Sequence, residues 1–420
     1  MQKKIAIIGL GYVGLPLAVE FGRKYKTIGY DTNIDRINEL SNGIDSTGEV
    51  SKRNLQSSIK LSVTSNLEDI AKCNYFIISV PTPIDKRNNP DLKILFKATS
   101  SIGTVLKKDD IVIYESTVYP GCTEEDCVPI LEKESGLKYN KDFFCGYSPE
   151  RINPGDKRRT LTKIVKITSG STPKIATQID NLYKSIINAG TYKTSSIRIA
   201  EAAKVIENCQ RDINIAFVNE LSIIFDKMNL DTKEVLDAAS SKWNFLPFTP
   251  GLVGGHCIGV DPYYLIYKAK TLGYHSNIMY AGRKLNDSFS KYISDNIITH
   301  YKNNKMNLSK VKTLILGVTF KENCPDTRNS KVINVYKDLM KHNVNIEVYD
   351  PFASKKEVAN KYGIDLIDYN QIKGKYYDCI LVAVAHEQFI NLDLGKFIKN
   401  KKSLIYDLKG IYDNKNYRRL

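Results

Sequence analysis

The chain has 420 residues, a formal net charge of +15, 42 % hydrophobic residues and 25 % charged residues. This composition is typical of a folded globular protein and argues against disorder. The length exceeds the roughly 250 to 300 residues that one hydrophobic core supports, so we expect two or more domains. No stretch approaches the roughly 18 apolar residues of a membrane-spanning helix, and a strand pattern begins near the N-terminus, so we expect a cytoplasmic protein with no membrane partner.

The cysteines, histidines and lysines exclude several further classes of site. The cysteines form no CxxC pair and the five histidines show no ligand spacing, which predicts no disulfide framework and no metal site. The lysines are spread along the chain without the aromatic residues or fold signatures of nucleic-acid-binding modules, so we expect no nucleic-acid partner. A basic surface also attracts small anions such as nucleotides.

Apolar, strand-like runs alternate with longer helical segments in the first part of the chain. Strands are expected near Lys3–Ile8, Thr27–Tyr30, Tyr75–Val80, Ile111–Glu115 and Ile164–Ile167. This alternation indicates parallel strands joined by helices. We therefore predict an α/β fold whose N-terminal Rossmann domain, a doubly wound parallel sheet, covers residues 1–195.

The middle of the chain predicts a helical connector over residues 196–303. Residues 196–228 contain no Gly or Pro and carry apolar residues at intervals of three and four, which predicts one long central helix. A second helical region is expected from Pro262 to Asn303. A helix of about 30 residues spans about 45 Å, long enough to carry the interface of a homodimer. The runs VKTLILGVTF, NIEVYDP, YYDCILVAVAH and SLIYDLKG then predict a second Rossmann-like domain over residues 304–420.

A glycine-rich turn follows the first expected strand. Its pattern is G-x-G-x-x-G, formed by Gly9, Gly11 and Gly14 with Tyr12 and Val13 inside it. The glycines permit the tight turn, the close approach of backbone to a pyrophosphate and the packing of helix on strand, which predicts a dinucleotide site. A turn that binds another nucleotide, or none, is the alternative.

Polar residues after the next strands extend this site. Asp31 ends the second strand, where its carboxylate can accept hydrogen bonds from both ribose hydroxyls and would repel a 2′-phosphate. NAD is therefore favoured over NADP, although nearby Arg36 could accommodate a phosphate. Pro81 and Thr82 in VPTP and Thr117 in EST lie at the expected carboxyl ends of strands, where ligands bind in such folds.

A second constellation centres on Cys257 in the segment GGHCIGVDPYY. An accessible thiol can attack a carbonyl, and Asp261, four residues later, can orient groups that carry its proton. Lys204 and Asn208 lie four apart on the predicted long helix and so project from one face. The alternatives are a buried structural thiol and a solvated lysine.

Seven motifs together resemble those of a known family. GLGYVGLPLA, VPTP, EST, SPERINPGD, EAAKVIEN, GGHCIGVDPYY and GVTFKENCPDTRNS occur in the order found in the UDP-glucose/GDP-mannose dehydrogenase family, and the resemblance covers essentially the whole chain. SPERINPGDK and GGHCIGVDPYY are similar to the branch that oxidises UDP-N-acetylhexosamines for bacterial surface polysaccharides.

The resemblance implies an NAD-dependent, four-electron oxidation of a sugar C6 alcohol to a carboxylate. The cysteine matched by Cys257 captures the aldehyde, and a second hydride transfer yields a thioester that water hydrolyses. The residue matched by Lys204 stabilises the oxyanion, and those matched by Asn208 and Asp261 position water and assist proton transfer. A cation aimed at a developing alkoxide is most effective where water is excluded, which agrees with this role.

The resemblance also implies a general acid or base and a partner for the phosphates. Glu150 is the candidate acid or base, with an ion pair to Arg151 as the structural alternative; both are expected near the substrate, with Thr117 nearby. The UDP-glucose branch has a second glutamate where this chain has Pro154, which argues against glucose. Arg328 matches a residue that approaches the cofactor's pyrophosphate.

The C-terminal domain is implied to hold the UDP-sugar. Lys321 matches a lysine at the sugar nucleotide, and Lys409 stands where many relatives have an arginine, so it would offer a point charge in place of a bidentate fork. The segment from Phe248 to Gly254, with Thr249, Pro250 and Gly251, matches one that lies along the substrate.

We interpret the chain as an NAD-dependent 6-dehydrogenase of UDP-N-acetylhexosamines, UDP-GlcNAc or UDP-GalNAc, acting as a homodimer. UDP-glucose and UDP-ManNAc are the alternative substrates. A β-hydroxyacid dehydrogenase that performs one hydride transfer without a thiol, and a sugar-nucleotide sensor without catalysis, are the alternative classes.

Overall fold

The structure is a computed structural model that describes residues 2–151, 160–255, 257–414 and 416–420. Its contacts divide the chain into two compact units. The N-terminal unit comprises Met1–Glu207 and Tyr263–Tyr274, and the C-terminal unit comprises Asn208–Pro262 and His275–Leu420. Each unit contains its own parallel sheet.

The sheet of the N-terminal unit runs in the order β3-β2-β1-β4-β5-β6, and all its pairs are parallel. Its central strands are apolar and buried, as expected for a sheet covered on both faces. The strand order reverses between β1 and β4, and ligands bind at the carboxyl ends of the strands beside such a reversal in sheets of this class. The strands are β1 (Lys4–Ile8), β2 (Lys26–Tyr30), β3 (Leu61–Thr64), β4 (Tyr75–Ile78), β5 (Ile111–Tyr114) and β6 (Phe144–Tyr147).

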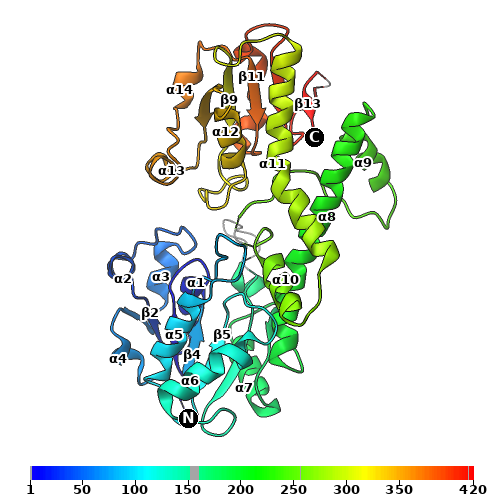
Figure 1. The fold of residues 1–420 in the computed structure, drawn as a ribbon. Helices are drawn as coiled ribbons and strands as arrows, with labels where there is room; N and C mark the ends of the chain where they lie inside the picture. The colour runs from blue at the N-terminus through cyan, green and yellow to red at the C-terminus, as the bar shows by residue number, and fades with distance from the viewer. Residues whose placement is uncertain (1, 152–159, 256, 415) are drawn as a thin grey trace. The chain divides into compact units, whose positions relative to one another are not determined.

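Helices pack on this sheet, and β7 (Lys166–Thr168) pairs with β8 (Thr191–Lys193) beside it. Figure 1 shows these helices around the sheet; α1 packs against β1, β2 and β3, and α5 packs against β4 and α6. The helices are α1 (Gly14–Gly22), α2 (Ile34–Ser41), α3 (Lys52–Ser57), α4 (Leu67–Ile70), α5 (Lys93–Gly103), α6 (Val128–Ser135) and α7 (Pro173–Lys184), with a π-helical turn at Thr123–Cys127 and a 3-10 turn at Leu161–Lys163.

The predicted doubly wound sheet is confirmed, with differences at its margins. β3 and β6 were not predicted, because each has four residues and lacks a long apolar run. The strand expected at Ile164–Ile167 begins at Lys166 and pairs with β8 outside the main sheet.

The long central helix is confirmed as α8, from Ile197 to Lys227. It is followed by α9 (Thr232–Ser240), α10 (Asp261–Thr271) and α11 (Asn277–Asn303). The second helical region predicted from Pro262 to Asn303 therefore consists of two helices. They are separated at Gly273, whose φ of 78° lies in the left-handed region that glycine adopts most readily.

The C-terminal unit carries the second predicted Rossmann-like sheet, in the order β10-β9-β11-β12-β13. Side chains alternate between its faces: Ile315 packs into a core with α11, whereas Leu314 and Leu316 pack into the opposite core. Its elements are β9 (Lys312–Leu316), α12 (Val332–Met340), β10 (Asn345–Tyr349), α13 (Lys355–Tyr362), α14 (Tyr369–Ile372), β11 (Cys379–Val382), α15 (Glu387–Ile390), a 3-10 turn (Leu394–Phe397), β12 (Leu404–Asp407) and β13 (Arg418–Arg419).

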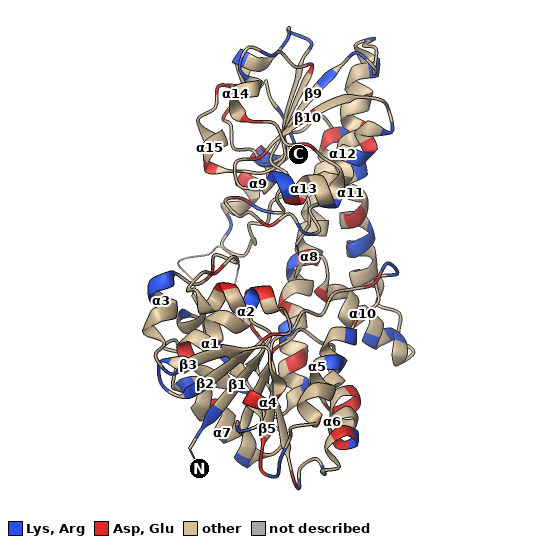
Figure 2. Ribbon diagram, turned by 90° about the vertical axis from the view of Figure 1, so that its left-hand side faces the viewer, with Lys and Arg blue, Asp and Glu red and all other residues tan. Residues whose placement is uncertain are grey.

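Charged residues and helix hydropathy add two observations. Figure 2 shows Lys and Arg on the ribbons of each unit, interleaved with Asp and Glu. Of the helices in the described ranges, none has both the length and the apolar character that crossing a membrane requires.

The glycine-rich turn between β1 and α1 leads to a prediction on stability. A Cβ on Gly14 would lie 1.9 Å from Gly9 O and 2.4 Å from Ser79 Oγ, whereas a Cβ on Gly11 would meet no atom within 4 Å. We expect Gly14→Ala to lower the free energy of unfolding by about 1–3 kcal/mol, as overpacking does. The matched variant Gly11→Ala should change it by no more than about 0.5 kcal/mol.

Denaturation followed by circular dichroism measures both variants. Equal stability of Gly14→Ala and Gly11→Ala would show that the packing of α1 on this turn does not require glycine at position 14.

Candidate active site

The turn after β1 has the geometry of a dinucleotide site. Gly9 has a φ of 91°, and its N–H donates to Tyr30 O at 2.9 Å. The N–H of Leu10 donates to Asp31 Oδ2 at 2.8 Å, so the carboxylate that follows β2 is held beside the turn. Space is open above Gly11, and Tyr12 and Val13 lead directly into α1. These residues therefore fit a pyrophosphate at the N-terminus of α1 and a ribose at Asp31.

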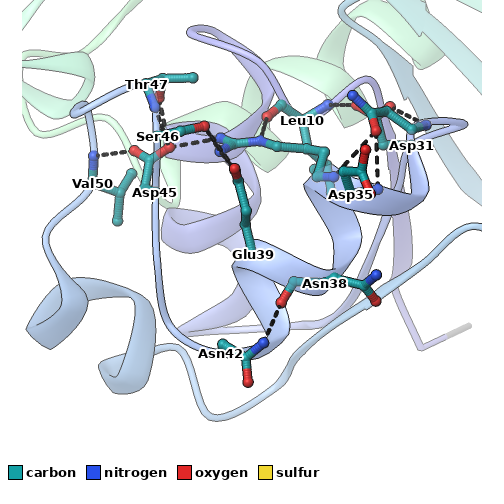
Figure 3. Close-up of polar contacts among 12 residues, drawn as sticks. Leu10, Asp31, Asp35, Asn38, Glu39, Asn42, Asp45, Ser46, Thr47 and Val50 are labelled. Atoms are coloured by element: carbon teal, nitrogen blue, oxygen red, sulfur yellow. Dashed lines mark hydrogen bonds and ion pairs between the residues drawn. The ribbon is translucent and has the colours of Figure 1, made fainter.

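Arg36, which left NADP open as a cofactor, is buried and bonded to several polar groups, and Figure 3 labels its partners Leu10, Glu39 and Asp45. Its guanidinium pairs with Asp45 at 2.7 Å and with Glu39 at 3.3 Å, and its Nε donates to Leu10 O at 2.9 Å. Two carboxylates therefore surround the cation that a 2′-phosphate would need. The geometry favours NAD, with Arg36 supporting the turn from below.

The loops after β4 and β5 are hydrogen-bonded to each other. Thr82 Oγ1 donates to Thr117 O at 2.7 Å, and Ser116 Oγ donates to Val80 O at the same distance. The predicted residues Thr82 and Thr117, with Pro81 between Val80 and Thr82, thus lie together at the carboxyl edge of the sheet. Tyr264, which sequence reasoning missed, is buried on α10 and donates its hydroxyl to Thr82 O at 2.8 Å.

Glu150 belongs to a buried cluster of charges behind β5. Lys166 Nζ lies 2.8 Å from Glu115 Oε2 and 3.3 Å from Glu150 Oε2, and all three side chains are buried. Tyr183 donates its hydroxyl to Glu115. The structural alternative was an ion pair between Glu150 and Arg151. Arg151 pairs with Glu207 at 2.6 Å, and Glu150 pairs with Lys166.

Burial sets the electrostatics of this cluster. It raises the pKa of Glu115, against the opposing effect of Lys166. It also disfavours the ammonium of Lys166, but Glu115 and Glu150 outweigh that cost and raise the pKa of this lysine. The cluster therefore holds a cation between two carboxylates. Sequence reasoning missed Lys166 and Glu115, because nothing in a short apolar run reveals which charges it buries together.

α8 buries apolar residues such as Ile197, Val205 and Val218, but it also buries a row of polar side chains. Spacings of three, four and seven residues place one set of polar side chains on a single buried face, here called the polar stripe: Glu201, Lys204, Asn208, Asp212 and Asn219. The opposite face exposes an apolar stripe, formed by Ile199, Ile206, Phe217 and Ile224, each 44–54 % exposed.

The N-terminal end of the polar stripe holds a backbone loop. Both oxygens of Glu201 accept hydrogen bonds, from Gly121 N at 2.6 Å and from Thr123 N at 2.9 Å. Burial raises the pKa of Glu201 to about 7, although these hydrogen bonds act to lower it. The loop that they hold begins four residues after Thr117.

Asn208, in the middle of the polar stripe, meets Asp261. Asn208 Nδ2 donates to Asp261 Oδ2 at 2.6 Å, and both side chains are buried. The structure therefore brings together two residues that the sequence separates by 53 positions. Lys204 is 5 % exposed and precedes Asn208 by one helical turn, so the two project from the same face of α8.

Cys257 is exposed, whereas the chain's other cysteines are buried. Its carbonyl accepts hydrogen bonds from Val260 N at 3.1 Å and Asp261 N at 2.9 Å, so a turn leads from Cys257 into α10. The alternative of a buried structural thiol is therefore wrong for this residue. An exposed thiol four residues before a buried Asp261 can act as a nucleophile toward a bound carbonyl.

The predicted substrate segment Phe248–Gly254 lies against Lys409. A Cβ on Gly251 would be 3.5 Å from Lys409 Nζ, and a cavity of about 110 Å³ is lined by Thr249, Pro250 and Lys409. Lys409 is exposed, although the protein atoms near its ammonium disfavour the charged form and lower its pKa, against the carboxylates of Glu322 and Asp407. An accessible cation beside this segment can interact with an anionic ligand.

The remaining predicted residues lie in the loop after β9. Gly254 packs against this loop, where a Cβ would be 2.7 Å from Asn329 O. Lys321 Nζ lies 5.9 Å from the ring centroid of Phe320. Arg328 forms a bidentate pair with Asp326, with its closest contact at 2.7 Å. Pro154 lies outside the described residues, and in the described ranges no group of three His, Cys, Asp or Glu side chains could hold a metal.

The buried cluster around Lys166 leads to a prediction on stability. Lys166→Met leaves two buried carboxylates without their cation, so we expect the free energy of unfolding to fall by about 3–5 kcal/mol. The matched variant Lys184→Met breaks a pair with Asp180 whose lysine is 55 % exposed, and it should lower that free energy by about 1 kcal/mol or less.

Urea denaturation of both variants tests this difference. Equal losses in the two variants would contradict a structural role for the buried cation.

Comparison with known proteins places this geometry in a family. Models of the UDP-glucose/GDP-mannose dehydrogenase family match the chain in order: its NAD binding domain matches residues 3–187, its central domain residues 198–288 and its UDP binding domain residues 314–414. The matched domains establish NAD as the cofactor and a UDP-sugar as the substrate class.

Individual proteins are similar over nearly the whole chain. UDP-N-acetyl-D-glucosamine 6-dehydrogenase of Pseudomonas aeruginosa is 55 % identical over 412 residues, which are 98 % of this chain and 97 % of the relative. The protein of that name from Salmonella typhi is 56 % identical over 411 residues, 97 % of this chain and 96 % of the relative. The solved UDP-D-ManNAc dehydrogenase of Pyrococcus horikoshii superposes with a TM-score of 0.89 at 29 % identity, covering 99 % of this chain and 98 % of that one.

The predicted resemblance and fold are thereby confirmed. The chain belongs to the UDP-glucose/GDP-mannose dehydrogenase family, as an NAD-dependent nucleotide-sugar dehydrogenase.

Proposed function

We propose that the protein oxidises the C6 alcohol of a UDP-N-acetylhexosamine, UDP-GlcNAc or UDP-GalNAc, to the uronic acid. The observation that carries this proposal is the exposed thiol of Cys257 in a turn that leads to the buried Asn208–Asp261 pair. A thiol supports oxidation past the aldehyde, because it can hold the aldehyde as a thiohemiacetal and the acid as a thioester. The two relatives at 55 % and 56 % identity, both named UDP-N-acetyl-D-glucosamine 6-dehydrogenases, support the choice of sugar.

The proposed reaction assigns roles to Glu150, Cys257, Lys204, Asn208 and Asp261. NAD supplies the acceptor for the two hydrides, one per bound molecule. Glu150 takes the proton of the C6 hydroxyl as the C6 hydride passes to NAD, which gives the aldehyde. Cys257 loses its thiol proton to water and adds to the aldehyde carbon, and the resulting oxyanion becomes the thioester when a second hydride leaves that carbon to a second NAD. Lys204 stabilises the oxyanion that forms, because a buried ammonium interacts with it at low dielectric. Asn208 and Asp261 position the water that hydrolyses the thioester, which returns the thiol and leaves the carboxylate.

The proposed binding residues are those that the sequence motifs single out. For NAD we propose the turn after β1 and the loops after β4 and β5, supported by the room above Gly11 and the bond that links Thr82 to Thr117. The proposed cofactor contacts are Gly9, Gly11, Tyr12, Val13, Gly14, Asp31, Pro81, Thr82, Thr117 and Arg328, with Arg36 below the turn. For the UDP-sugar they are Glu150, Arg151, Lys204, Asn208, Phe248, Thr249, Pro250, Gly251, Gly254, Lys321 and Lys409.

We further propose three functional domains and a homodimer. The domains are the NAD-binding residues 1–195, the connector 196–303 and the UDP-sugar-binding residues 304–420. The apolar stripe of α8 supports the homodimer, because an exposed row of large apolar side chains on one helix face is typical of a protein interface.

UDP-glucose and UDP-ManNAc remain the alternative substrates, and a single hydride transfer of the β-hydroxyacid type remains the alternative reaction. An exposed cysteine in the site favours the four-electron reaction over this second class.

The stoichiometry of the reaction distinguishes these possibilities. With NAD in excess, we expect two NADH for each UDP-GlcNAc or UDP-GalNAc consumed, because aldehyde and acid are reached in successive hydride transfers. UDP-ManNAc and UDP-glucose should give kcat/KM values at least about tenfold lower, equivalent to about 1.4 kcal/mol of discrimination. Absorbance at the NADH band and chromatography of the sugar nucleotides measure both quantities. One NADH per sugar would contradict the proposal.

Removal of the thiol provides a second test. We expect Cys257→Ala to lower net turnover by on the order of a thousandfold or more, because the aldehyde can no longer be held covalently. Cys73→Ala is the matched control, since burial raises the pKa of Cys73 to about 11 and keeps this thiol unreactive. Steady-state kinetics and the dissociation constant of UDP should show lost catalysis with retained binding. Turnover of Cys257→Ala near that of the control would remove the thiol from the mechanism.

A further inference from the structure

Four buried polar side chains join α8 to α11 within the C-terminal unit. They form what we call the α8–α11 network: Asp212 and Asn219 from α8 with Arg283 and Asn286 from α11, each at most 2 % exposed. Arg283 Nη1 donates to Asp212 Oδ1 at 2.6 Å, and Asn286 Nδ2 donates to the same oxygen at 2.7 Å. Buried polar groups carry a large desolvation cost, so they persist where their hydrogen bonds fix a geometry.

Asn219 is the member of this network that leaves the two helices. Its Oδ1 accepts from Gly251 N at 2.8 Å, and its Nδ2 donates to Gly251 O at 3.1 Å. One amide thus satisfies both backbone groups of a buried glycine in a segment without regular secondary structure. These two hydrogen bonds fix the distance of Gly251 from α8 and the orientation of its backbone.

The rest of the network fixes the orientation of the Asn219 amide. Its second N–H donates to Asn286 Oδ1 at 2.9 Å. Asn286 must present that oxygen, because its own Nδ2 donates to the carboxylate and the carbonyl of Asp212. A reversed Asn219 amide would lose its bonds to Gly251 and Asn286 alike. The contact with Gly251 is therefore determined from α11 as well as from α8.

Gly251 lies where the substrate segment opposes Lys409. A Cβ there would be 3.5 Å from Lys409 Nζ, so the backbone height of Gly251 sets the space in front of that cation. The same network also reaches the turn that follows Cys257, since a Cβ on Gly259 would be 3.9 Å from Arg283 Nη1. One buried cluster therefore supports the chain on both sides of Cys257.

We propose that Asn219 is a positioning residue for UDP-sugar binding. It holds segment Phe248–Gly254 at the distance from Lys409 that binding of the UDP-sugar requires. The proposal rests on the proposed function, in which this segment and Lys409 contact the substrate. Asn219 touches neither ligand in this scheme. Removal of the Asn219 side chain should therefore weaken binding of the UDP-sugar and leave NAD binding unchanged.

The test compares Asn219→Ala with Ser222→Ala in the full-length protein. Ser222 is buried on the next turn of α8, and its hydroxyl donates to Asn219 O within the helix, so it is a matched control that does not contact the segment. We expect Asn219→Ala to raise KM for UDP-GlcNAc about tenfold, the loss of one to two hydrogen bonds. KM for NAD should stay within about twofold, and Ser222→Ala should change neither constant by more than that.

Hydrogen exchange of the peptide that contains residues 248–254 reports on the contact itself, without substrate. The Gly251 amide donates to Asn219, so its exchange should be accelerated in Asn219→Ala and unchanged in Ser222→Ala. Asn286→Ala keeps both bonds to Gly251 but removes the group that orients them. It should produce smaller changes in the same direction, and it replaces Asn219→Ala if that variant does not fold.

The outcomes separate this proposal from the proposed function. Accelerated exchange with an unchanged KM for UDP-GlcNAc overturns the positioning role, even where the contact exists. Equal increases of KM for UDP-GlcNAc and for NAD overturn it as well, because they indicate general loosening. If the wild-type protein oxidises no UDP-sugar, the proposed function fails. The dissociation constant of UDP then decides the positioning role, which predicts weaker binding in Asn219→Ala alone.

Discussion

The row of polar side chains that α8 buries is the constraint on which the candidate site depends. An ordinary surface helix buries an apolar face, whereas α8 buries the polar stripe together with apolar residues such as Val205 and Val218, and exposes the apolar stripe. Burial of five polar side chains on one helix is unfavourable unless each has partners. For three of them these partners are backbone or side-chain groups of separate segments: the loop at Gly121, Asp261 and Gly251. The helix is therefore hydrogen-bonded to the loop at Gly121, to the start of α10 and to the segment at Gly251.

The turns at Gly9 and Gly317 have the same backbone geometry, but the carboxylate beside each turn has different partners. Gly9 and Gly317 both follow a first strand with φ near 90°, and each donates its N–H to the last residue of the next strand. The carboxylate after that strand then accepts from the turn: Asp31 from Leu10, and Asp350 from the two residues after Gly317. In the C-terminal unit His386 contacts this carboxylate and lowers the pKa of Asp350 to about 2. The second turn thus stabilises its own unit with a carboxylate in the same position as Asp31, which we propose as the contact to the ribose of NAD.

The sequence carries enough information for the elements and for the chemistry of single residues. Apolar runs bounded by turns predicted most strands, and the absence of Gly and Pro predicted α8 to within one residue. Short strands such as β3 could not be found, because four residues with one side exposed give a weak pattern. The exposure of Cys257 and the Asn208–Asp261 contact depend on tertiary packing. Lys166 and Asn219 gave no local signal, since a lysine in a strand and an asparagine in a helix are usually solvated.

The polar stripe also limits how this part of the chain can change in length. Each residue added to an α-helix turns everything beyond it by about 100° and advances it by about 1.5 Å. A single insertion between Asn208 and Asn219 would swing the second amide away from Gly251 while the first still faced Asp261. Loops tolerate added residues better, because an insertion in a loop does not rotate the elements that follow it. The number of helical residues between Asn208 and Asn219 is therefore fixed wherever both side chains must keep their contacts.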